Sequence, residues 1–591
     1  IAAESKVTMI VLGVGKSIDP ALAKLETKAV YLTPLSRLPN DERLRLYQEL
    51  NSRHVATFSI LGEQEVRAGV LVGRRPVTSS DKIARRVALH IVRIARGDAP
   101  ESLRVSMQLP ERLMINMKTA RTIKISPSWR VLTEAELIDY ASGRTARKID
   151  LISVMKEALA GNLNVRALEL ALSAGEASVR GSRASLLPNI SASSTARTID
   201  KDGALFAPQH LWNGKISATQ VLWSERAWAG YSVQKLAQKS RKYELVTGKL
   251  DVLGDVAVAY LNVVRAKTVV RIQHDNLKAT RANLEAARAQ FDAGASSKAD
   301  VYRWDSQIAN ARKALIDASA SRNIAEISLQ QILNRPPEER FETTDELSQP
   351  QAIELLQGIE RYLNNPSTFR LFRQFLIAEA VRRSPEIQQL DAAIAVQVRL
   401  EKSAKRALYS PTLSATGSVS QRFYRGGASS TQPVPNGTDW FLGLTLSVPI
   451  YEGGRYAEID RNSLEVSRLQ AQRLNIENSI SQRAATRLHQ MGASFAGIGL
   501  GREAAEAAEE NYKLVAAAYA EGAVRIVDVI DAQNAWFTSD SRAADSVYVF
   551  LIDWMNVQRA VGHFTTLMEK SERQVLIKRV DAYIAQEKQA P

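Results

Sequence analysis

An internal repeat constrains this sequence more than any other feature. The segment Pro-Asn-Ile-Ser that begins at Pro188 recurs 223 residues later, at Pro411, as Pro-Thr-Leu-Ser. Further on, Phe-Asp-Ala-Gly294 is matched by Tyr-Ala-Glu-Gly522 at an offset of 228 residues. The five extra residues of the second copy fall in the Gly- and Pro-rich stretch 426–437, where a loop can absorb an insertion. We therefore expect two tandem copies of a unit of about 190 residues.

Each copy reads as a helix, two strands, a long helix, a tight turn and a returning helix. The clearest strand runs from Asp439 to Val448, where large apolar side chains alternate with side chains that, apart from Phe441, are small or polar. Its apolar face consists of Trp440, Leu442, Leu444, Leu446 and Val448. The other expected strands cover 189–197, 215–222 and 412–421. One face suited to lipid is typical of a transmembrane β-strand.

Aromatic residues gather near the strand ends, as they do at membrane interfaces. They are Trp212, Trp223, Tyr409, Phe423, Tyr424, Trp440 and Tyr451. The alternative is a soluble β-hairpin packed on helices, with these rings in its core. Such a hairpin would have to hide five large apolar residues on one face of a single strand.

Two proline-free stretches rich in Ala, Leu, Arg, Lys and Glu predict very long helices. They run from Ser224 to Phe291 and from Arg455 to Ala520, and each would span roughly 100 Å. Shorter helices over 300–334 and 528–563 should return antiparallel after the turns. Such pairs have little core of their own, so they must pack against other pairs or other subunits.

The first 146 residues follow a different pattern. Apolar segments at 7–13, 29–35 and 56–62 read as short strands, and 41–52 and 79–97 read as amphipathic helices. This alternation predicts a small α/β domain with a parallel sheet.

Composition excludes several classes of function. The absence of cysteine excludes a thiol redox enzyme, a zinc ribbon and a disulfide scaffold. The six histidines are scattered without partners at metal-ligand spacing, so we expect no metal, no cofactor and no enzyme activity. The net charge of +15 comes from basic residues without interleaved aromatics, which argues against nucleic-acid binding. No apolar run has the length of a transmembrane helix, and any export signal should have been removed or lie upstream of Ile1.

At the repeat, the sequence resembles the TolC-like outer-membrane efflux family, over about residues 151–564. The most specific segment is Tyr519-Ala-Glu-Gly-Ala-Val-Arg-Ile-Val-Asp528-Val-Ile-Asp531-Ala-Gln533. Supporting segments are Pro411-Thr-Leu, the run from Leu446 to Gly454, and Phe291-Asp-Ala-Gly294 ahead of Asp300.

The resemblance implies a mainly α protein with a β-barrel part, in the outer membrane with its helices in the periplasm. Three protomers would each give four strands to one barrel and their long hairpins to a periplasmic α-barrel. The implied function is a passive exit duct of a tripartite efflux or type I secretion system. Its partners would be a periplasmic adaptor protein and an inner-membrane pump of the RND, ABC or MFS type. Four strands cannot close a barrel, so a single chain would leave edges unpaired in lipid.

The resemblance also assigns roles to residues near the two turns. The candidates are Asp528 and Asp531 for a channel aperture, Asp300, Tyr519 and Arg525 for a latch that closes the tip, and Gly294 and Gly522 for adaptor docking. The family's latch arginine is Val524 here, so its neighbour Arg525 is the candidate. Helix capping is the alternative explanation for the aspartates and for the glycines.

The N-terminal segment resembles the C-terminal part of periplasmic ABC-type substrate-binding proteins. The similarity lies in Pro76–Arg96, Leu109–Ala120 and Val131–Leu137. Much of the first lobe of that family is missing, so a ligand sensor and a truncated remnant both stay open. A rival function for the whole chain is a soluble binding or sensing module with an oligomerising coiled coil. The expected domains are 1–146 (α/β), 147–335 (first repeat), 336–370 (linker), 371–565 (second repeat) and 566–591 (tail).

Overall fold

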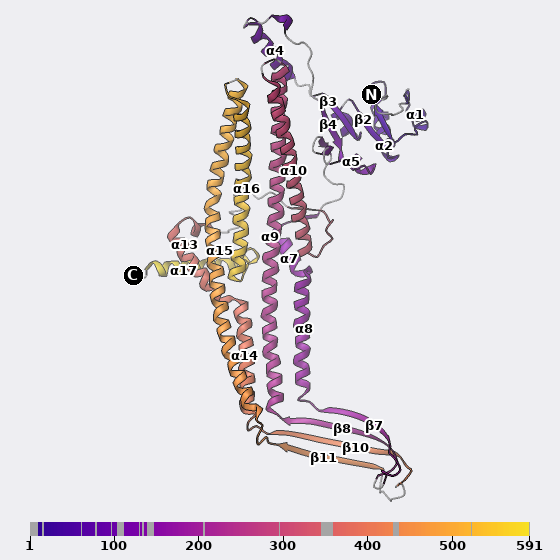
Figure 1. Ribbon diagram of the computed structural model, residues 1–591, viewed down its shortest axis with the longest axis vertical. Helices are drawn as coiled ribbons and strands as arrows, with labels where there is room; N and C mark the ends of the chain where they lie inside the picture. The colour runs from indigo at the N-terminus through magenta and orange to yellow at the C-terminus, as the bar shows by residue number, and fades with distance from the viewer. Residues whose placement is uncertain are drawn as a thin grey trace.

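The computed structural model describes residues 10–14, 17–60, 62–76, 80–95, 97, 99–102, 111–128, 131–132, 135–138, 147–204, 207–292, 294, 296–343, 358–428, 437–521 and 523–589. The molecule is elongated: long helices stand side by side, a sheet crosses one end, and a small α/β domain lies to one side (Figure 1). In the described part, no helix has both the length and the apolar composition needed to cross a bilayer.

Each copy of the repeat is built on one very long helix. α9 (Glu225–Asp292) has 68 residues and α15 (Gly454–Ala520) has 67, and neither contains the proline that would interrupt it. Two shorter helices lie end to end along each of them (Figure 1): α8 (Leu163–Ala184) and α10 (Lys298–Ile332) along α9, and α14 (Pro385–Arg406) and α16 (Ile526–Val561) along α15. The predicted order of elements is therefore confirmed in both copies.

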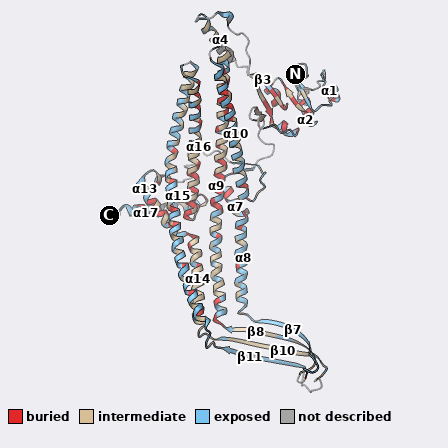
Figure 2. Cartoon of the chain, viewed as in Figure 1, coloured by how far each residue is buried: buried red, intermediate tan, exposed pale blue. Residues whose placement is uncertain are grey.

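Four strands form one antiparallel sheet at the end of the helices. They are β7 (Asn189–Thr198), β8 (His210–Trp223), β10 (Thr412–Gly426) and β11 (Thr438–Ser447). Their order is β11-β10-β8-β7, so the hairpins of the two repeats pair through β10 and β8. Among the described residues, the outer edges of β7 and β11 have no partner strand. No residue of these four strands is buried (Figure 2).

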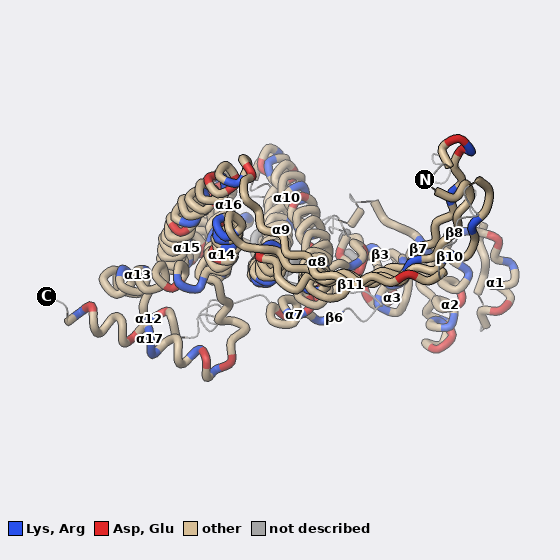
Figure 3. Tube along the Cα trace, turned by 90° about the horizontal axis from the view of Figure 1, so that it is seen from below, with Lys and Arg blue, Asp and Glu red and all other residues tan. Residues whose placement is uncertain are grey.

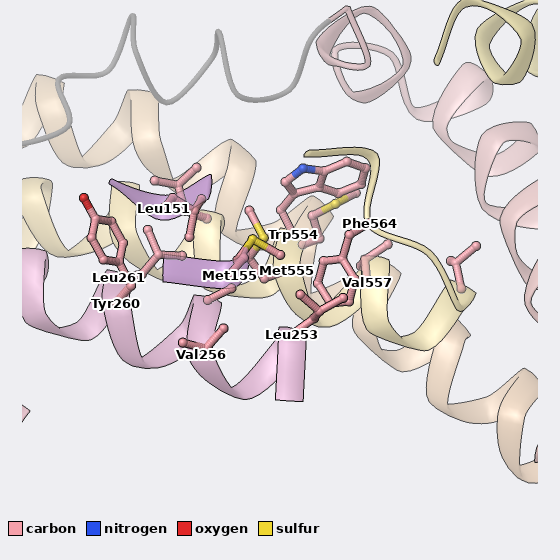
Figure 4. Close-up of a cluster of buried hydrophobic side chains, with 14 of the residues drawn as sticks. Leu151, Met155, Leu253, Val256, Tyr260, Leu261, Trp554, Met555, Val557 and Phe564 are labelled. Carbon is pink, nitrogen blue, oxygen red and sulfur yellow. The ribbon is translucent and has the colours of Figure 1, made fainter. Parts of the chain in front are cut away.

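The largest hydrophobic cluster lies midway along the long helices. There α7 (Leu151–Gly161) packs against α9 and the end of α16, and Met155, Val256 and Met555 are fully buried. Figure 4 shows side chains from these three helices meeting in one interior, with Phe564 beside them. This cluster joins the two repeats away from both ends of the molecule.

A belt of short elements surrounds that cluster. It contains α12 (Glu360–Leu363), α13 (Pro366–Arg383), the 3-10 helix η2 (Thr565–Leu567), α17 (Lys570–Gln589), and the parallel strand pair β6 (Arg147–Ile149) and β9 (Phe341–Thr343). Glu379 of α13 is 3% exposed and accepts two hydrogen bonds from Arg579 of α17, at 3.1 and 2.9 Å. Arg382 and Arg383 contact the same carboxylate. The C-terminal segment is therefore a helix anchored by ion pairs.

The N-terminal domain has a five-stranded sheet in the order β1-β2-β3-β4-β5. Its elements are α1 (Asp19–Ala23), β1 (Ala29–Leu32), α2 (Asn40–Ser52), β2 (Ala56–Ser59), α3 (Glu63–Arg67), β3 (Val72–Pro76), α4 (Ser80–Ala95), the 3-10 helix η1 (Pro100–Ser102), β4 (Glu111–Asn116), α5 (Met117–Thr122) and β5 (Glu136–Ile138). The prediction of a parallel sheet is wrong at its centre, because β3 and β4 are antiparallel. The chain leaves β3 and enters β4 at the same end of the sheet, so the two neighbouring strands run in opposite directions.

Two further predictions for this domain need correction. Of the strand expected at 7–13, residues 7–9 lie outside the described part, and residues 10–13 are not a strand. The helix expected at 79–97 forms as α4, but it lies near the tip of α9 and α10 rather than on the sheet (Figure 1).

Candidate functional site

The two helical hairpins end in tips that start their returning helices in the same way. At α10, the backbone N of Ser297 donates to Oδ2 of Asp300 (3.2 Å), and the backbone N of Asp300 donates to Oγ of Ser297 (3.3 Å). At α16, the backbone N of Arg525 donates to Oδ2 of Asp528 (3.0 Å). Both carboxylates therefore satisfy a free donor at a helix start, as the capping alternative requires.

The aperture candidates nevertheless keep access to solvent. The side chain of Asp528 is 39% exposed, and Nη2 of Arg525 approaches its Oδ1 at 3.4 Å. Because the Arg525 side chain is itself 82% exposed, this ion pair neutralises little of the charge. Asp531 lies on the next turn, is exposed, and has no ion pair among the described residues. Within the same residues, no cluster of His, Asp or Glu is arranged to hold a metal ion.

The latch candidates come together only in part. The phenol of Tyr519 is half-buried in the tip, where burial and then the charge of Asp300 raise its pKa. Its Oη has no hydrogen-bond partner among the described residues. Arg525 pairs with Asp528 instead of joining Tyr519 and Asp300. Within one chain the tip therefore brings Tyr519 near Asp300 and leaves Arg525 outside.

An apolar cluster holds the two tips together. Trp304 and Ile308 of α10, Leu284 of α9, and Ile526 and Val529 of α16 are all buried in it. The first turn of α16, which carries Asp528, is thus fixed by its apolar side against the other hairpin.

Of the two glycines proposed for adaptor docking, the structure describes Gly294 only. Gly294 has φ +71°, a conformation that L side chains rarely adopt, so glycine has a structural reason to be there. A Cβ on Gly294 would lie 3.1 Å from Nη1 of Arg93, so α4 reaches this turn. Gly522 lies outside the described residues.

The sheet has one apolar face over all four strands. The register sets Leu442 opposite Gly417 and Leu444 opposite Ala415, so their side chains share a face. The five predicted residues of this face are between 53% and 78% exposed: Trp440, Leu442, Leu444, Leu446 and Val448. The opposite face carries mainly Ser and Thr, with Oγ of Ser191 2.9 Å from Oγ of Ser217, but also the exposed ring of Phe441. A soluble hairpin packed on helices would cover these apolar residues, and here they are bare.

Aromatic and charged residues divide the strands into zones. Trp223, Tyr409 and Tyr451 lie at the helix end of the sheet, and Trp212, Phe423, Tyr424 and Trp440 lie toward its loop end. The charged residues of the strands are Arg197, Lys215, Arg422, Arg425 and Asp439, all toward the loop end, and the strands are mostly uncharged in Figure 3. β11 has 10 residues, which is the length that a tilted strand needs to cross the apolar layer of a membrane.

These features define a class: a protein that carries a sheet with a bare apolar face at one end of two long helical hairpins. The profile of the family described as "Outer membrane efflux protein" matches residues 154–335 and 376–563. The chain belongs to this family. Family membership places it in the outer membrane, as an efflux channel protein with its long helices in the periplasm.

Individual relatives agree with the assignment. Nodulation protein T of Rhizobium leguminosarum bv. trifolii is 22% identical over 409 residues, which cover 67% of this chain and 82% of the relative. Outer membrane protein TolC of Escherichia coli (strain K12) is 24% identical over 371 residues, covering 59% and 69%. Among solved structures, the CmeC outer membrane channel of Campylobacter jejuni has a TM-score of 0.56 at 16% identity, covering 73% of this chain and 89% of its own. The MtrE channel of Neisseria gonorrhoeae, in its open state, has a TM-score of 0.55 at 17% identity, covering 70% and 89%.

Proposed function

We propose that three copies of this chain assemble into one outer-membrane duct. Each copy would give its four strands to a shared barrel and its long helices to a periplasmic tube. The observation that carries the proposal is the sheet, whose apolar face is bare and whose edge strands β7 and β11 lack partners among the described residues. In lipid every backbone N–H and C=O must be paired, so a ring of strands closed by several copies satisfies both features.

The helical tips would form the periplasmic end of the duct. Three copies around one axis would bring together six carboxylates from Asp528 and Asp531. Crowded carboxylates attract cations, so we infer an aperture that prefers cations and is blocked by divalent ions. The latch would involve Tyr519 and Asp300, which lie on different hairpins. Arg525 would have to leave Asp528 to join it.

The turns at Gly294 and Gly522 would meet a periplasmic adaptor protein, which links the duct to an inner-membrane pump of the RND, ABC or MFS type. Substrates would then pass through the lumen without chemical change, in tripartite efflux or type I secretion. The N-terminal domain would lie in the periplasm beside the helices. The rival function, a soluble binding module with a coiled coil, leaves the bare apolar face of β11 unexplained.

Fractionation of membranes tests the proposal directly. We expect the protein in the outer-membrane fraction, soluble only in detergent, and migrating unheated at about three times its 65.2 kDa chain mass and boiled as a single chain. An oligomer that stays in the aqueous phase and is indifferent to detergent would contradict the duct and favour the soluble module.

A further inference from the structure

A polar cluster interrupts the apolar seam between the two hairpins. Gln533 of α16 is fully buried, and its Nε2 donates to Oδ1 of Asn276 (3.0 Å) and to Oγ1 of Thr280 (2.7 Å). Its Oε1 accepts from Nδ2 of Asn283 (2.7 Å), which also donates to Oη of Tyr512 (3.0 Å). We call these five residues the amide lock. It connects α9, α16 and α15.

The geometry of the amide lock permits one register between the helices. Asn276, Thr280 and Asn283 lie on one face of α9, and together they use both hydrogens and the oxygen of the Gln533 amide. If α16 slid or rotated against α9, buried amide groups would lose their partners and bear the full cost of desolvation. The apolar contacts around the lock are non-directional and would tolerate such a shift far better.

A neighbouring contact shows what the amide lock adds. Nε2 of Gln307 donates to Oδ1 of Asn534 at 2.7 Å, so α10 and α16 are joined one residue further along. That pair is exposed, and water can replace either partner when the helices move. Of these two contacts, the buried one therefore makes a change of register costly.

We propose that Gln533 is a positioning residue that fixes the start of α16, and with it the two aperture carboxylates, against α9. This inference rests on the proposed function. Asp531 lies two residues before Gln533 on the same helix and Asp528 five, so the position of the amide sets the position of both carboxylates. A change in the width of the aperture by movement of α16 against α9 would break the amide lock.

Single-channel recording of purified protein in planar bilayers tests this role. Gln533→Leu keeps the volume of the side chain and removes its hydrogen bonds. We expect the open fraction to change about tenfold, because the lost contacts stabilise one arrangement of α16 against α9 over any other. Asn534→Leu is the matched control, since it removes an exposed contact of the same helix, and it should gate like the wild type.

Tyr512→Phe tests the role of the amide lock if Gln533→Leu fails to assemble. It removes only the hydroxyl bonded to Asn283 and keeps the ring stacked on Trp536, whose centroid is 5.1 Å away. We expect the open fraction to change about twofold, in the same direction as in Gln533→Leu, with unchanged trimer yield. Wild-type gating in an assembled Gln533→Leu, or in Tyr512→Phe when the former does not assemble, would overturn the inference. A wild-type protein that forms no pore would sink the proposed function itself, and the inference with it.

Discussion

The carboxylate of Asp528 caps α16 and also remains accessible to solvent. One oxygen accepts the backbone N–H of Arg525 at the start of α16, while the side chain remains 39% exposed. Asp300 holds the equivalent place at the start of α10, opposite Ser297. The capping residue differs between the repeats, so the carboxylate is what the two tips share. Capping and a role in the aperture are therefore compatible, and they can be separated because asparagine keeps the acceptor and removes the charge.

Replacing Asp528 and Asp531 together with asparagine should weaken the preference of the pore for cations. We expect the cation-to-anion permeability ratio to fall about threefold and block by divalent ions to weaken in parallel, because the carboxylate ring supplies the attraction. Reversal potentials in a salt gradient measure this. Asp531→Asn alone separates the two roles, since Asp531 caps no helix among the described residues: it should alter selectivity while the melting temperature stays constant. Unchanged selectivity and unchanged divalent block in the double variant would leave only the helix-capping role.

Among single residues, the sequence predicted those that belong to a local motif and missed those that contact a helix far away in the chain. Asp300, Asp528 and Gly294 stand at turns whose chemistry is local, so their positions were predictable. Asn276 and Asn283 of the amide lock look like ordinary polar positions on a long helix. Their burial depends on α16, which lies some 250 residues away in the chain. The local pattern of the sequence does not encode a contact between segments so far apart.

Among the elements, β11 offers a direct test of which face meets lipid. Leu444→Arg should lower the stability of the inserted protein by about 2–4 kcal/mol if the residue lies near the bilayer midplane. Thr445→Arg is the matched control, because it places the same charge one residue away on the opposite face. We expect trimer yield in the outer membrane to fall for Leu444→Arg and to hold for Thr445→Arg. Equal yields for the two variants would show that this face does not contact lipid.

The contact between α13 and α17 depends on one buried carboxylate. Burial acts to raise the pKa of Glu379, but hydrogen bonds from Arg579 and Arg382 and the charge of Arg383 more than offset it and lower the pKa to about 2. A carboxyl whose folded pKa lies below its ordinary 4.5 stabilises the fold above that pH. This contribution is lost as the pH falls from 4.5 toward 2.

Glu379→Gln should therefore release α17 at neutral pH. We expect a loss of about 2 kcal/mol, less than for a fully buried pair because the arginines are partly exposed. Limited proteolysis of α17 measures the release, and Glu572→Gln, an exposed change on the same helix, is the control. The variant should also lose less stability than the wild type as the pH falls below 4.5, because it lacks the contribution of this one carboxylate. A variant that resists protease like the wild type would show that apolar contacts alone dock this helix.

The elements themselves were predictable in proportion to their length and periodicity. The two helices of more than 60 residues and the alternating strands of the repeat are confirmed within a few residues. The strands β3, β4 and β5 were missed. β3 contains two arginines and a proline, and β5 has three residues. Neither offers the alternation that marks a strand. The antiparallel β3–β4 pair depends on where the chain returns, which no local signal encodes.

For the whole molecule, the family match begins only after the N-terminal domain. A chain that lacks residues 1–138 should still insert and trimerise, with a yield within about twofold of the full chain, because the repeat carries the barrel strands and the main core. The cut must spare β6, which pairs with β9 beside the central cluster. Heat-modifiable migration measures the outcome. Loss of the trimer on this deletion would give the N-terminal domain a role in assembly.

The edges of β7 and β11 that lack partners among the described residues also predict whether a mutant allele is dominant or recessive. In the proposed trimer each copy completes its neighbours, so the phenotype of a cell with two alleles depends on which part of the chain is altered. An allele that spoils an edge strand would be recessive, because its product cannot enter the ring. An allele that keeps the strands and blocks the aperture would be dominant: with equal expression, only about one eighth of the trimers would contain three sound copies.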